Sequence, residues 1–157
     1  MMKGFSKIWL IGILALLVGG GISAWQWFGA LGEISKNNIA ITYTSENYAW
    51  GEQIQRIEIS KNGEITYSSK NGAKKEEGSG KLSEEDLKEI SDFIVSNRFF
   101  DLSDDLTIPS CADAPTEYLE ITINKKTHRS GGGCIENETF RVIVEKLEEI
   151  VENKIEL

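Results

Sequence analysis

Apolar and polar residues alternate in several short segments after residue 38, which is the pattern of half-buried β-strands. These segments are residues 39–44, 52–67 and 118–123, followed by a weaker strand at 127–130. The longest is interrupted by Lys61-Asn62-Gly63, a hairpin signal. A two-residue Asn-Gly loop would place Ile59 on the opposite face from Ile65. A three-residue loop with a left-handed Gly63 pairs these two isoleucines on one face, so we expect the three-residue loop.

Two further segments have the apolar spacing of amphipathic helices. The first begins with Ser83 as its cap and Asp86 at the third position, a capping box, and it should end near Asn97. The second should begin near Asn137, and its apolar stripe runs from Phe140 to Val151. Residues 71–80 are polar and charged, and residues 130–133 are rich in glycine, so both are expected to be flexible loops. The expected core residues are Ile57, Ile59, Ile65, Leu87, Ile90, Ile94, Leu119, Ile121, Ile143 and Leu147.

The order of these elements predicts an α+β domain. An antiparallel sheet of about five strands, in the order β-ββα-ββα, would pack on two helices in two layers, since each hairpin needs a helix to cover its apolar face. The other sheet face would meet water. This domain is expected to occupy residues 39–157, after an N-terminal transmembrane helix and a linker at 29–38.

Residues 8–28 contain no charged side chain, and a helix of this length spans about 31 Å, close to the thickness of a bilayer's hydrocarbon core. Trp9 lies near one end, and Trp25 and Trp27 near the other, where membrane interfaces favour aromatic rings. Lys3 and Lys7 precede the segment, and positive charges favour the cytoplasmic side of a membrane. Residues 1–7 are therefore expected in the cytoplasm, followed by a single-pass anchor with the domain outside. The alternative is a signal peptide cleaved after Ser23, which gives a secreted domain.

The chain has 17 basic and 25 acidic residues. Only two of the basic residues precede the apolar segment, so 15 basic and 25 acidic residues follow it. A domain this acidic lacks the basic face that binding to nucleic acid requires. No cofactor and no metal site is expected, because two cysteines and one histidine lack metal-ligand spacing. The run Ser130–Gly133 lacks the strand and the Lys-Ser/Thr pair of a phosphate-binding loop, and no catalytic set is found.

Cys111 and Cys134 bracket the second hairpin. In an exported domain, two cysteines are expected to form a structural disulfide. The alternative hypothesis is an exported thiol enzyme that uses Cys134 or Cys111 with His128, which requires a free thiolate. A thiol count without reductant separates these two hypotheses.

Several motifs resemble emfourin-type domains, a family of small bacterial inhibitors of thermolysin-like metalloproteases. They are the NYAWG turn at 47–51, the hairpin with KNG at 61–63, LSEED at 82–86, NRFFDL at 97–102, EYLEITINKKTH at 117–128 and the closing amphipathic helix. The resemblance covers roughly residues 39–150 and includes neither the apolar segment nor the cysteine pair. It implies the α+β fold and an inhibitory activity, without assigning that activity to any residue.

The sequence therefore favours a membrane-anchored extracytoplasmic binding domain with the lipid bilayer as one partner, through residues 8–28, and a protein as the other. A protease-inhibitor-like role is the most specific form of this hypothesis. The alternatives are the thiol enzyme and a structural protein of the cell envelope.

Overall fold

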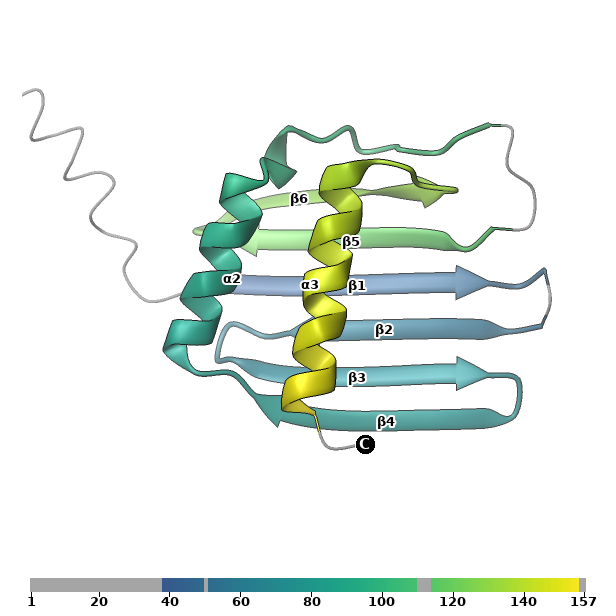
Figure 1. Cartoon of the computed structure of the whole chain (residues 1–157), viewed down its shortest axis with the longest axis horizontal. Coiled ribbons are helices and arrows are strands. Elements are labelled where there is room, and N and C mark those ends of the chain that lie inside the picture. The colour runs from purple at the N-terminus through teal and green to yellow at the C-terminus, as the bar shows by residue number, and fades with distance from the viewer. Residues whose placement is uncertain (1–37, 50, 110–113, 156–157) are drawn as a thin grey trace, which may run out of the picture. The chain divides into compact units, whose positions relative to one another are not determined.

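A computed structural model describes residues 38–49, 51–109 and 114–155. These residues form a six-stranded antiparallel sheet and two helices, and the strand order in the sheet is β4-β3-β2-β1-β5-β6. Both helices lie over the same face of the sheet (Figure 1). In chain order the elements are β1 (Ile39–Asn47), β2 (Gln53–Ile59), β3 (Glu64–Asn71), β4 (Lys74–Lys81), α2 (Glu84–Ser96), the 3-10 turn η1 (Phe99–Asp101), β5 (Thr116–Ile123), β6 (Lys126–Gly133) and α3 (Glu138–Lys154).

The expected number of five strands is wrong, because residues 74–80 of the expected loop form most of a sixth strand. β4 pairs with β3 along its whole length. Its sequence does not alternate, since glycines take two of the positions that face the helices: Gly78 opposite Tyr67 and Gly80 opposite Ile65. Large side chains of β3 fill that space instead. A Cβ atom on Gly80 would overlap the carbonyl oxygen of Lys154, so the end of α3 approaches the strand where it has no side chain.

The β2–β3 hairpin has the expected register. Ile59 pairs with Ile65 and Ile57 pairs with Tyr67. The loop has three residues, and Gly63 has a φ of +81°, in the left-handed region that favours glycine. The periodicity argument therefore gave the loop length and the buried face correctly.

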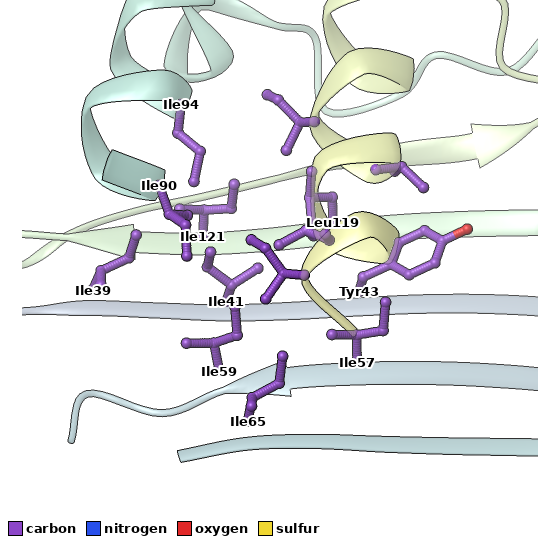
Figure 2. Close-up of a cluster of buried hydrophobic side chains, with 14 of the residues drawn as sticks. Ile39, Ile41, Tyr43, Ile57, Ile59, Ile65, Ile90, Ile94, Leu119 and Ile121 are labelled. Atoms are coloured by element: carbon purple, nitrogen blue, oxygen red, sulfur yellow. The ribbon is translucent and has the colours of Figure 1, made fainter. Parts of the chain in front are cut away.

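The core lies between the sheet and the two helices (Figure 2). All ten residues expected there are buried, none of them more than 4% exposed. Isoleucines of β1, β2 and β3 form much of the sheet's contribution, together with Leu119 and Ile121 of β5. Phe99 and Phe140 are fully buried as well, and they lie at the start of η1 and in the first turn of α3.

Both helices begin where the sequence indicates. Ser83 caps α2, its hydroxyl accepts a hydrogen bond from the Asp86 amide, and the Asp86 carboxylate accepts one from the Ser83 amide in return. The Ser83 hydroxyl also donates to the Asp86 carboxylate at 2.7 Å, and this bond together with the one from the Ser83 amide holds the pKa of Asp86 below its usual value. Asn137 caps α3 through the amide of Phe140. α2 ends at Ser96 with Asn97 as its C-cap, as expected.

The glycine-rich run is not a flexible loop, because Ser130–Gly133 is the second half of β6 and pairs with β5. The glycines are needed for close approach on both sides of this strand. A Cβ atom on Gly131 would lie 2.5 Å from Tyr118 Cδ1, and one on Gly132 would lie 2.8 Å from the backbone nitrogen of Thr107. Residues 104–108 run along the outer edge of β6, where the Leu106 amide donates to the Gly131 carbonyl at 2.7 Å.

The expected fold also included a transmembrane helix. Within the described residues, neither helix is long and apolar enough to cross a membrane. The expected anchor at 8–28, with Trp9, Trp25 and Trp27, lies outside the described residues. The fold established here is the six-stranded sheet with two helices.

Candidate binding surface

The sheet face away from the helices is polar and carries no covering element in the described part of the chain (Figure 1). Side chains on a strand alternate between faces, so the positions between the buried isoleucines project from this open face. They include Thr42, Thr44, Arg56, Glu58, Thr66, Ser68, Glu120 and Thr122. The open face thus combines β-branched hydroxyls with charges of both signs.

A hollow of about 590 Å³ lies on this open face over β2, β3 and β4. Two cross-strand rows line it: Glu58 with Thr66 and Ser79, and Arg56 with Ser68 and Glu77. The Arg56 guanidinium lies 2.5 Å from a carboxylate oxygen of Glu58, and both side chains are about half exposed. A water-exposed pair of this kind contributes little to stability. It can exchange its partner for a charge on a bound molecule.

The helix-facing side contains one buried ionic cluster. Glu117 is 4% exposed, and its carboxylate accepts a 2.6 Å hydrogen bond from the Tyr43 hydroxyl. The Arg141 guanidinium of α3 lies 2.7 Å from the other carboxylate oxygen. Arg141 also donates to the Ile135 carbonyl, so the guanidinium joins β5 to the chain before α3. Burial and the hydrogen bond to Glu117 raise the pKa of Tyr43 well above its usual value.

Glu148 of α3 lies near this cluster and is half buried. Its burial raises the pKa of its carboxyl group, against a hydrogen bond from Gln55 of β2 that lowers it. The negative charge of Glu117 raises it further. Burial and the neighbouring carboxylates therefore outweigh the Gln55 hydrogen bond, and the pKa of the Glu148 carboxyl group lies above its usual value.

The structure does not bring His128 and Cys134 of the hypothetical thiol enzyme together, and Cys111 lies outside the described residues. His128 lies near the start of β6 and Cys134 directly after its end, a separation of about 20 Å along an extended strand. The His128 ring packs edge-on against Phe99, with ring centroids 5.3 Å apart, and its Nδ1 atom is 3.7 Å from a carboxylate oxygen of Asp104. His128 therefore packs under η1 and does not lie beside Cys134.

The expected disulfide involves Cys111, which lies outside the described residues. Cys134 has a φ of +55°, and no cysteine in the described part of the chain is free. The thiol enzyme hypothesis thus has no free thiol at Cys134, and the pairing with Cys111 stays a prediction. Among the described residues, no group of three His, Cys, Asp or Glu side chains is arranged to hold a metal ion.

Sequence reasoning missed the buried cluster, although a signal for it was present. In the alternating segment that contains Leu119 and Ile121, Glu117 occupies the next position on the same face. An acidic residue at a strand position that faces the hydrophobic core needs a cationic partner. Arg141 lies near the start of a helix otherwise rich in glutamate, which marks it as that partner.

No protein-family model matches the chain, and no curated protein matches its sequence. The surfaces described above therefore rest on their own geometry and chemistry.

Proposed function

We propose that residues 38–155 form a protein-binding domain that acts outside the cytoplasm and uses the open sheet face as its binding surface. The observation that carries this proposal is the hollow over β2, β3 and β4, with the half-exposed Arg56–Glu58 pair in its wall. Its lining residues belong to three adjacent paired strands, so the sheet fixes their backbone positions. A rigid polar surface with charges of both signs is suited to a folded protein partner.

The resemblance to emfourin-type inhibitors suggests the class of partner. A thermolysin-like metalloprotease is the target we propose to test first. An inhibitor of this kind needs only a stable surface, and the described structure supplies a sheet backed by a continuous hydrophobic core.

The test is a titration of a thermolysin-like metalloprotease with the purified whole chain, with cleavage of a peptide substrate as the readout. Arg56→Glu should raise the inhibition constant at least tenfold, because it reverses a charge at the centre of the surface. Lys88→Glu is the matched control, because Lys88 forms an equally exposed pair with Asp92 on α2.

Unchanged proteolysis at saturating concentrations of the chain would reject the inhibitor role. Equal effects of Arg56→Glu and Lys88→Glu would reject the open face as the binding surface. Circular dichroism of both variants establishes that each is folded.

A further inference from the structure

The helix-facing side of the sheet extends beyond its helical cover. Figure 1 shows α2 and α3 over one end and the middle of the sheet, while the last residues of β1 and β3 and the first residues of β2 lie beyond them. A second hollow of about 230 Å³ lies there. Its lining includes six neutral residues at helix-facing positions, Ser45, Asn47, Gln53, Gln55, Ser69 and Asn71, and is completed by Ile54, Lys70 and Pro115.

These six residues form two rows across three strands and will be called the amide patch. One row pairs Ser45 with Gln55 and Gln55 with Ser69, and the next pairs Asn47 with Gln53 and Gln53 with Asn71. Adjacent strands are about 4.8 Å apart, so the patch presents a regular array of hydrogen-bonding groups. Each amide offers both donors and an acceptor, and each hydroxyl can do either.

The choice of residues in the amide patch is unusual for a solvated strand surface. Exposed strand positions favour threonine and other β-branched residues, and asparagine is depleted there. The open face of the same strands follows this preference, with Thr42, Thr44 and Thr66. In the described structure the side chains of Gln53, Ser69 and Asn71 make no hydrogen bond within the chain. Their amide and hydroxyl groups are therefore available to a ligand.

We propose that the amide patch binds a neutral polysaccharide. The six residues carry no charge. The cations beside them are paired, Lys70 with Glu52 and Lys74 with Glu76. A charged ligand would therefore meet no free charge at the patch, whereas sugar hydroxyls pair with neutral amides and hydroxyls. The hollow is smaller than the roughly 300–1,000 Å³ of sites that enclose a small molecule, which favours a chain lying across the surface.

An extended peptide fits this surface less well. Peptides that bind to sheets usually add a strand at an exposed edge, where their backbone pairs with free backbone groups. The three strands of the amide patch are internal, because β4 and β5 flank them. A peptide would thus find side chains but no free edge, while a polysaccharide requires only side chains.

The test is native affinity electrophoresis of the whole chain in non-ionic detergent, in gels that contain dextran, hydroxyethylcellulose or glycol chitin. The negative net charge of the chain gives it mobility without added dye. We expect at least one polysaccharide to retard the protein. Ser69→Arg, which fills the hollow, should weaken this binding at least tenfold, measured from the retardation at increasing polysaccharide concentration.

Ser68→Arg is the matched control, because Ser68 neighbours Ser69 on β3 but projects from the open face. It should leave the retardation unchanged and weaken binding of the protein partner instead. Mobility in gels without polysaccharide corrects for the added charge. The double variant Gln53→Ala/Asn71→Ala removes two free amides without adding bulk and should also weaken retardation.

Three results would overturn the proposal: no retardation by any of the three polysaccharides, equal loss in Ser68→Arg and Ser69→Arg, or full retardation in the double variant. Because the two serines project from opposite faces, failure of the polysaccharide proposal leaves the proposal for the open face untouched, and the reverse also holds.

Discussion

The carboxylate of Glu117 lies 2.7 Å from the guanidinium of Arg141, and the two differ sharply in exposure. The side chain of Glu117 is 6% exposed, whereas that of Arg141 is 38% exposed. Water can therefore solvate Arg141 if the pair is broken, but it cannot reach Glu117. The carboxylate depends on its partner more than the guanidinium does.

This asymmetry predicts unequal effects of removing either partner. Arg141→Met leaves a buried, uncompensated carboxylate and should lower the free energy of unfolding by about 3 kcal/mol. Glu117→Gln leaves a guanidinium that water still reaches, and it should cost about 1 kcal/mol. Urea denaturation of both variants at pH 7 measures the difference. Equal losses would show that Glu117 is solvated in solution.

The raised pKa of Tyr43 predicts that the folded protein loses stability at alkaline pH. Burial and the hydrogen bond to Glu117 raise the pKa of the folded phenol above its ordinary value of about 10. Above pH 10 the unfolded phenol loses its proton while the folded one keeps it, so the folded state binds more protons and its stability falls with rising pH.

The measurement compares the wild type with Tyr43→Phe. At pH 8 the variant should be less stable by about 1.5–3 kcal/mol, because it lacks a hydrogen bond to a charged group. The difference between the two should shrink as the pH rises above 10. A constant difference from pH 8 to pH 11 would contradict the raised pKa.

The features that the sequence predicted best are those set by regularly spaced apolar side chains or by helix-capping residues. Ile57, Ile59 and Ile65 determine both the buried face and the loop length of the β2–β3 hairpin, because one shift of register would expose them. Ser83 and Asn137 marked the two helix starts for an equally local reason, the need to satisfy free amides. Periodicity and capping act within a few residues, so sequence reveals them.

The parts that sequence did not predict depend on contacts between distant segments. The sequence of β4 does not alternate between apolar and polar residues, because the end of α3 approaches the strand at Gly80. The two contacting residues, Gly80 and Lys154, are 74 positions apart in the sequence. Ser130–Gly133 forms a strand because β5 pairs with it on one side and residues 104–108 follow it on the other. Glycine indicates flexibility in an isolated segment and close packing in a folded one.

The candidate surfaces were likewise hidden at the level of sequence. The six residues of the amide patch come from three strands and are separated by loops, so nothing local groups them. The sheet face that carries Arg56 and Glu58 was expected to meet water, and both side chains are about half exposed. The hollow beside them depends on β4, the strand that was not expected.

The raised pKa of Glu148 predicts how the stability of the protein changes at mildly acidic pH. Burial raises the pKa of its carboxyl group in the folded state, so folding favours the protonated form. Its contribution to stability is present below the ordinary carboxyl pKa and is lost as the pH rises through the raised value. Glu148→Gln mimics the protonated form and should make the protein at least as stable as the wild type at pH 7. The urea midpoints at pH 5 and pH 7 should also lie closer together in the variant, and a large loss of stability at pH 7 would show that the ionised form is the favoured one.

The glycine run of β6 allows two neighbouring substitutions to be compared within one strand. A Cβ atom on Gly131 would overlap the carbonyl oxygen of Glu117 and lie 2.8 Å from the Tyr118 Cα atom, and backbone atoms of the paired strand β5 cannot move aside cheaply. At Gly133 the nearest atom would be the Thr107 methyl group at 3.9 Å, an ordinary contact. Gly131→Ala should therefore cost about 2–3 kcal/mol, whereas Gly133→Ala should change stability by no more than about 0.5 kcal/mol. Thermal and urea unfolding of the two variants provide the measurement. If both substitutions were tolerated equally, β5 and β6 would not be as closely paired at this end as the structure shows, and the run would be the flexible loop that its composition suggests.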